Sequence, residues 1–173
     1  MALTYELIAS QTLASNASSY TFSSIPNTYT HLVLVANWKA LAAQYGMFIS
    51  FNGTTSGQNQ YSYVYILSEL GSTGTGVGYP ISTRDTIGMG YNGAGSAAFD
   101  GVLKVYIPFY TSSYTKTVTY RSGSGDYYDN IQGFGNWSGT GAINSIRIAI
   151  DGFANRTSFT TGSKFYLYGI KGA

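Results

Sequence analysis

The segment Thr30-His-Leu-Val-Leu-Val-Ala-Asn-Trp38 decides the fold class, because its apolar side chains recur with a period of two. One face of the segment is apolar at every second position: Leu32, Leu34, Ala36 and Trp38. The opposite face carries Val33 and Val35. An extended segment with apolar side chains on both faces predicts a β-strand that is buried on both sides.

The same alternation recurs on either side of this segment. The other ranges with a period of two are 3–10, 20–23, 47–52, 61–68, 102–109, 118–120, 146–151 and 164–171. They are rich in the β-branched and aromatic residues that fit a pleated surface. Pairs such as Asn52-Gly53 and Asp151-Gly152, which tolerate a positive φ, indicate turns between them. Only Trp38 to Gln44 has a helix-forming composition, for about two turns at most.

About eight to ten strands at this spacing predict an all-β chain that forms an antiparallel sandwich or a barrel. Neither a repeat nor a linker interrupts residues 1–173, so we expect a single domain. The first and last segments, Leu3–Ser10 and Lys164–Lys171, both have the pattern of full strands. We therefore predict that both ends of the chain pair into the sandwich, within the same sheet.

The composition excludes several classes of function. Charged residues make up 9% of the 173 residues, against about 25% in an ordinary domain, and the net charge is +2. So small a net charge, without basic blocks, does not indicate a surface that binds nucleic acid. Without cysteine there is no disulfide framework and no metal–thiolate site. No apolar run approaches about 18 residues, so we expect no membrane insertion. The first residues do not resemble a secretory signal, so we expect the chain to be made in a cytoplasm.

Motifs that carry chemistry are weak in this sequence. Gly88-Met-Gly-Tyr-Asn-Gly93 matches G-x-G-x-x-G, but no helix is expected after it to hold a pyrophosphate, so we predict a loop and no cofactor. His31 is the only histidine, which favours a structural role over catalysis or metal binding. Asp126 and Asp129 could bind calcium through oxygen ligands, although their spacing is not that of an EF-hand. We expect that the chain is not an enzyme. A glycan-degrading activity remains an alternative only because seven carboxylates are present.

A cluster of aromatic and polar residues gives the most specific candidate site. Aromatic rings stack on the apolar face of a sugar while amides and carboxylates bond its hydroxyls. The candidate glycan-binding residues are Tyr127, Tyr128, Asp129, Asn130 and Trp137. Two alternatives remain open at this point. The segment is a strand with core aromatics, to which Ile131, Gly133 and Gly135 also belong, or the rings lie in a subunit interface.

Both ends of the chain and one central turn resemble a known family. The motifs are Tyr5-Glu-Leu-Ile-Ala-Ser-Gln-Thr-Leu13, Tyr20-Thr-Phe-Ser-Ser-Ile-Pro26, Tyr29-Thr-His-Leu-Val-Leu-Val35, Phe51-Asn-Gly53 and Phe165-Tyr-Leu-Tyr-Gly-Ile-Lys171. They are similar to small β-rich proteins from the structural gene regions of tailed bacteriophages, notably phages of aquatic bacteria. The middle third of the chain, including residues 71–98, has no counterpart in that pattern.

The resemblance implies a jelly-roll-like β-sandwich on the virion, as a capsid decoration protein or a fibre component. It also implies self-association, with a homotrimer favoured, and contact with other virion proteins. These motifs belong to the scaffold, so they transfer no site residues. The alternative function is a module at a tail-fibre tip that binds a glycan of the host surface.

Overall fold

The described part of the chain forms twelve strands, which include the predicted alternating segments. The computed structural model describes residues 4–40, 45–53, 60–68, 79–92, 100–124, 130–151 and 158–171, and these ranges contain no helix. The larger sheet has the spatial order β1 (Thr4–Thr12), β12 (Lys164–Lys171), β3 (His31–Trp38), β8 (Gly101–Pro108), β9 (Lys116–Ser124), β10 (Asn130–Trp137), β5 (Tyr61–Ser68) and β6 (Tyr79–Arg84). The smaller sheet has the order β2 (Ser19–Phe22), β11 (Ile146–Asp151), β4 (Tyr45–Phe51) and β7 (Ile87–Asn92).

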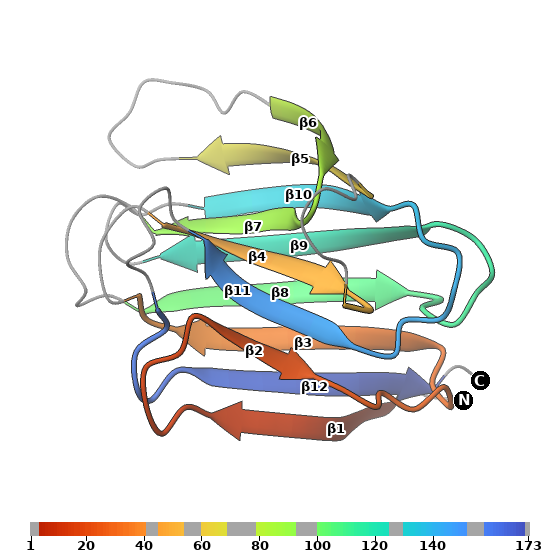
Figure 1. The fold of residues 1–173 in the computed structure, drawn as a ribbon, viewed down its shortest axis with the longest axis horizontal. Coiled ribbons are helices and arrows are strands. Elements are labelled where there is room, and N and C mark those ends of the chain that lie inside the picture. Colours follow the sequence, from red (N-terminus) through yellow and green to blue (C-terminus); the bar gives the residue numbers. More distant parts are fainter. Residues whose placement is uncertain are drawn as a thin grey trace.

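The two sheets form a jelly-roll-like β-sandwich, which confirms the predicted fold class. Figure 1 shows the smaller sheet lying across the middle of the larger one. The chain repeatedly changes sheet: β1, β3, β5, β6 and β8 belong to the larger sheet, whereas β2, β4 and β7 belong to the smaller one. The predicted number of strands was too low, because β6 and β7 lie in the stretch whose sequence carries the weakest alternation.

The core lies between the sheets and follows from the period of two. On β3 the side chains of Leu32 and Leu34 have no exposed surface, and they belong to the same buried cluster as Ile49 on β4 and Ile148 on β11. Val33, on the outer face of β3, is only 1% exposed. The prediction that this strand is buried on both sides is therefore confirmed at Val33.

Both terminal strands belong to the larger sheet, as predicted, and they are also direct neighbours in it. β12 lies between β1 and β3, so the C-terminal strand is an interior strand of the larger sheet. Thr4 is the register partner of Lys171, and Thr12 is the partner of Lys164. β1 lies at the edge of this sheet, with β12 as its only partner among the described residues.

One local prediction was wrong, and one segment lies mostly outside the described residues. In the segment with a helix-forming composition, Trp38 ends β3 and Ala40 forms an isolated bridge with Phe159, whereas residues 41–44 lie outside the described ranges. The glycine-rich motif was expected to be a loop, but residues 88–92 belong to β7, and Met89 has no exposed surface. Glycine does not prevent a strand here, because β7 forms ladder hydrogen bonds with β4 and the intervening Met89 side chain is buried.

Candidate functional site

Trp137, the central residue of the predicted glycan platform, faces the core. Only 4% of its surface is exposed, because it is on the inner face of β10. Its indole N–H donates a hydrogen bond to Oε1 of Gln60 at 3.0 Å. The ring of Phe51 meets the indole nearly edge-on, with the ring centroids 5.6 Å apart.

The remaining side of the indole is covered by Lys116, its cross-strand partner on β9. The Lys116 ammonium lies 5.7 Å from the centroid of the Trp137 ring and donates hydrogen bonds to the backbone carbonyls of Ser112, at 2.8 Å, and Tyr114. Burial lowers the pKa of Lys116 below its usual value of 10.5. An enclosed indole cannot stack on an external sugar, so the assignment of Trp137 to the glycan platform is wrong and the core-strand alternative is correct for this residue.

The other members of that platform are not brought together by the described structure. Tyr127, Tyr128 and Asp129 lie outside the described residues, and so does Asp126, the other candidate calcium ligand. Asn130 is exposed at the start of β10. The glycan hypothesis therefore needs a different aromatic surface.

Exposed apolar side chains gather on the outer face of the larger sheet. Five of the seven large apolar side chains that are exposed in the described residues belong to strands of this sheet: Tyr5, Leu7, Val64, Val102 and Phe134. The other two, Phe109 and Tyr114, lie between β8 and β9. Soluble monomers rarely expose a large continuous apolar surface, so this face is the candidate for binding sites.

The part of this face on the two terminal strands is a patch that we call the tyrosine edge: Tyr5, Leu7, Tyr166 and Tyr168. The rings of Tyr166 and Tyr168 are stacked with centroids 6.5 Å apart, and Tyr5 meets Tyr168 edge-on at 6.4 Å. Leu7 is the register partner of Tyr168 and is 55% exposed. Because β1 is the edge strand, this apolar patch borders backbone groups that have no ladder partner in the described chain.

A second part of the same face is hollowed and basic. The hollow has a volume of about 600 Å³ and lies over β8, β9, β10 and β5. We call it the basic hollow, and the side chains that define it are Lys104, Tyr106, Thr119, Arg121, Gln132, Phe134 and Val64. The sequence alone does not predict this hollow, because only the strand register brings these four strands side by side.

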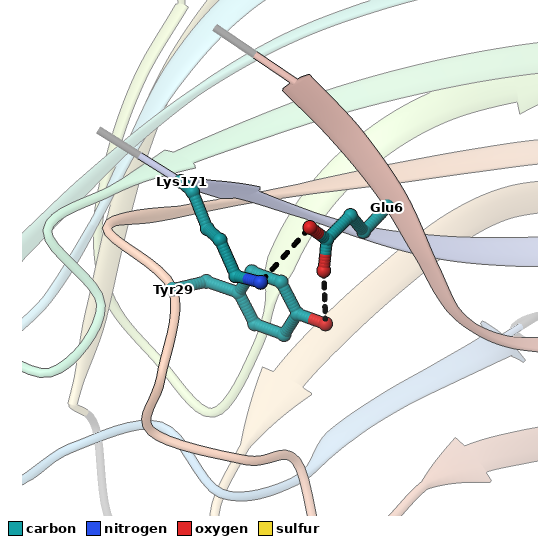
Figure 2. Close-up of polar contacts among 3 residues, drawn as sticks. All are labelled: Glu6, Tyr29 and Lys171. Carbon is teal, nitrogen blue, oxygen red and sulfur yellow. Dashed lines mark hydrogen bonds and ion pairs between the residues drawn. The ribbon is translucent and has the colours of Figure 1, made fainter. Parts of the chain in front are cut away.

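A polar triad joins the two terminal strands near one end of the sandwich (Figure 2). The Glu6 carboxylate accepts hydrogen bonds from the Lys171 ammonium at 2.9 Å and from the Tyr29 hydroxyl at 3.2 Å. The bond from Lys171 lowers the pKa of Glu6 below its usual value of 4.5, and the bond from Tyr29 acts in the same direction, whereas desolvation opposes both. The same bond raises the pKa of Lys171. This arrangement neutralises the carboxylate and leaves it no evident chemical role.

The other candidate residues take structural positions. The Nδ1 atom of His31 accepts a hydrogen bond from the backbone N–H of Phe109 at 3.1 Å, so His31 ties the start of β3 to the end of β8. Asp100 forms an ion pair with Lys39 at 3.2 Å. Within the described residues no group of three or more histidine, aspartate or glutamate side chains could hold a metal ion. No helix in this part of the chain is long and apolar enough to span a membrane.

Comparison with known proteins gives no family for this chain. No family model matches it, and no curated protein matches it. Among solved structures, a peanut lectin bound to a 9-residue peptide aligns over 99% of this chain and 93% of its own, with 9% identity and a TM-score of 0.37. An aerolysin-like protein from Bombina maxima aligns over 88% of this chain and 91% of its own, with 10% identity and a TM-score of 0.11. Neither similarity is close enough to bear on function.

Proposed function

We propose that this chain is a non-enzymatic structural protein of a tailed-phage virion, where it is a capsid decoration protein or a fibre component. In this role it binds further copies of itself and other virion proteins. The sequence resemblance described above supports the virion location. The observation that carries self-association is the tyrosine edge, an apolar patch on β12 and the edge strand β1, whose outer side has no partner strand among the described residues.

The physical argument starts from the edge strand β1. Free backbone N–H and C=O groups on an edge are a template for another chain, and natural proteins usually protect them with charge, proline or a bulge. β1 has one such feature, a shift in register between Leu7 and Ala9, but its outer side chains next to the edge are apolar, with Tyr5 53% and Leu7 55% exposed. With a net charge of only +2, repulsion between copies is weak. Covering this patch in a closed homo-oligomer, with a trimer favoured, removes both the apolar surface and the free edge from water.

The test is the mass of the purified chain in solution, measured by sedimentation, for the wild type and for Leu7→Lys. We expect a trimer for the wild type and a monomer for Leu7→Lys, because a lysine ammonium at Leu7 would have to be buried without a partner. Val102→Lys is the matched control: Val102 is 54% exposed on the same sheet but lies on β8, so its variant should keep the trimer.

The virion location has its own test. Mass spectrometry of purified particles should detect the chain at a fixed ratio to the major capsid or tail protein. A chain that is a stable monomer and is missing from particles contradicts the proposal. The alternative function, a glycan-binding module at a tail-fibre tip, would also place the chain on particles, but it predicts binding to host-surface glycan and does not require the Leu7→Lys effect.

A further inference from the structure

We propose that the basic hollow is a binding site for an acidic saccharide, in which a sugar carboxylate lies between Lys104 and Arg121 and the sugar ring stacks on Phe134. This site goes beyond the structural role proposed above and does not depend on it. It uses none of the residues 127–129 or Trp137.

The strand register places two different kinds of side chain in parallel rows across the hollow. Lys104, Arg121 and Gln132 are successive register partners on β8, β9 and β10. Two residues further along the same strands, Tyr106, Thr119 and Phe134 form the next row. Neighbouring strands lie about 4.8 Å apart and two residues along a strand span about 6.8 Å, so one ligand of sugar size reaches both rows.

The charge on this surface calls for an anion. The four strands β5, β8, β9 and β10 contain the basic residues Lys104, Lys116 and Arg121 and no acidic residue. Lys116 points into the core, whereas Lys104 and Arg121 are exposed directly opposite each other. Like charges in that position repel, and neither has an acidic partner in the described chain. A carboxylate between them removes the repulsion, and the arginine fork can hold it with two hydrogen bonds.

The second row supplies what a sugar ring needs. Phe134 is 57% exposed, and Val64, its register partner on β5, is 37% exposed, so together they offer an apolar floor. The Gln132 amide and the Thr119 hydroxyl stand beside that floor as donors and acceptors for sugar hydroxyls. Flat apolar surface next to a few fixed polar groups is the usual composition of a small-ligand site, and about 600 Å³ is within the usual size range.

The position of the hollow argues against the two other kinds of anionic ligand. An acidic peptide would gain most of its affinity by adding a strand to a sheet edge, but β8, β9 and β10 are interior strands whose backbone groups already pair with neighbours. A nucleic acid would need many phosphate contacts, and only two cations are present here. A single carboxylated sugar matches two cations and one aromatic floor.

The test is titration of the full-length chain with hexagalacturonate at low salt, followed by calorimetry. We expect saturable binding that weakens at least about tenfold in Lys104→Gln and in Arg121→Gln, because a hydrogen bond to a charged group is lost. Arg147→Gln is the matched control, since Arg147 is exposed on β11 of the opposite sheet and its variant should bind like the wild type. Phe134→Ser should also weaken binding, whereas Tyr114→Ser, which removes a 77% exposed ring outside the hollow, should not.

Two related oligomers of the same length test which chemical features of the ligand are recognised. Maltohexaose, a neutral sugar of the same length, should not bind, and hexaglutamate should bind more weakly than hexagalacturonate. Equal binding of hexaglutamate would overturn the proposal in favour of an acidic peptide, and no binding of hexagalacturonate would overturn it outright. Thermal melting distinguishes an effect on binding from an effect on folding. Arg121→Gln relieves the repulsion between Lys104 and Arg121, so this variant should melt at or above the wild-type temperature. A lower melting temperature would assign Arg121 a structural role instead.

Discussion

The Lys171 ammonium donates a hydrogen bond to the Glu6 carboxylate across 2.9 Å, although the two residues are 165 positions apart in the chain. The ammonium also lies 5.6 Å from the centroid of the Tyr29 ring, whose hydroxyl donates to the same carboxylate. One side chain from each terminal strand and one from the loop before β3 thus close the end of the sandwich together.

This contact predicts a specific loss of stability in acid. The pKa of Glu6 is lowered below 4.5 in the folded state. The contact with Lys171 therefore stabilises the folded chain fully above pH 4.5, and this stabilisation is lost as the pH falls through the folded-state pKa. Lys171→Met should therefore unfold at lower urea concentration than the wild type at neutral pH, and the difference should shrink in acid. Lys164→Met, on the same strand, is the control and should show no such pH dependence. An unchanged difference at low pH would contradict this account.

His31 predicts a second pH effect with its own window. Burial lowers the pKa of His31 below 6.5, and its Nδ1 atom must be unprotonated to accept the Phe109 N–H. As the pH falls, His31 is protonated in the unfolded chain before it is protonated in the folded chain. The contribution of neutral His31 to the free energy of unfolding is therefore fully present above pH 6.5 and declines below it. Titration of the imidazole by NMR should give a midpoint under 6.5, and His31→Gln should flatten the dependence of unfolding on pH in that window.

Gly133 predicts a strong response to one added methyl group. A Cβ at this position would lie 2.3 Å from the Tyr120 ring and 2.5 Å from the Val64 carbonyl oxygen, which is backbone and cannot easily move away. Overpacking of this kind costs about 1–3 kcal/mol, so Gly133→Ala should lower the unfolding free energy by about that much. Gly141→Ala, where a Cβ meets nothing within 4 Å, should be neutral in the same urea titration.

Two buried tyrosines predict opposite results for the same substitution. The Tyr120 hydroxyl is buried without a hydrogen-bond partner among the described residues, and burial raises its pKa. The Tyr110 hydroxyl donates to the backbone carbonyl of Pro26. Tyr120→Phe removes only an unsatisfied group and should keep or raise stability, whereas Tyr110→Phe leaves a carbonyl unpaired and should cost about 1 kcal/mol. Equal losses in both variants, measured by thermal melting, would show that the Tyr120 hydroxyl has a partner in solution.

The interior position of β12 predicts the outcome of two truncations. Deleting residues 165–173 removes the buried side chains of Phe165, Leu167 and Ile170, each worth about 1.5–3 kcal/mol, and separates β1 from β3. Such a loss is comparable with a whole stability margin of about 5–15 kcal/mol, so this chain should be insoluble or molten. Deleting residues 1–12 removes only an edge strand and should leave a cooperative, less stable fold. A cooperative melt near the full-length temperature after the C-terminal deletion would refute this.

The segments with a strict period of two were predictable because burial alone determines them. On β3, β8 and β12 every inward position is apolar, and the alternation specifies both the strand and its inner face. The turn at Asn52-Gly53 was equally clear, since both residues have the positive φ, 53° and 69°, that this pair tolerates. β7 was missed because Gly88 and Gly90 supply no side chain from which a period could be recognised.

The location of the binding surfaces could not be read from the sequence for a different reason. Trp137 has aromatic and amide neighbours in sequence whether it faces the core or solvent, and only the register of β10 decides between them. Lys104 and Arg121 are 17 positions apart and become neighbours through the pairing of β8 with β9. Local patterns determine which face of a strand is apolar, but they do not determine which strands lie side by side.

The adjacent terminal strands also determine how the molecule responds to mechanical force. Because β1 and β12 are antiparallel partners, with Thr4 opposite Lys171, a pull applied to both ends acts on the same end of one ladder (Figure 1). The ladder hydrogen bonds, which run across the strands, are then loaded one after another rather than all at once. The chain should peel open at low tension when stretched from its two ends. A handle on β1 combined with one on the far edge strand β6 should require a higher rupture force.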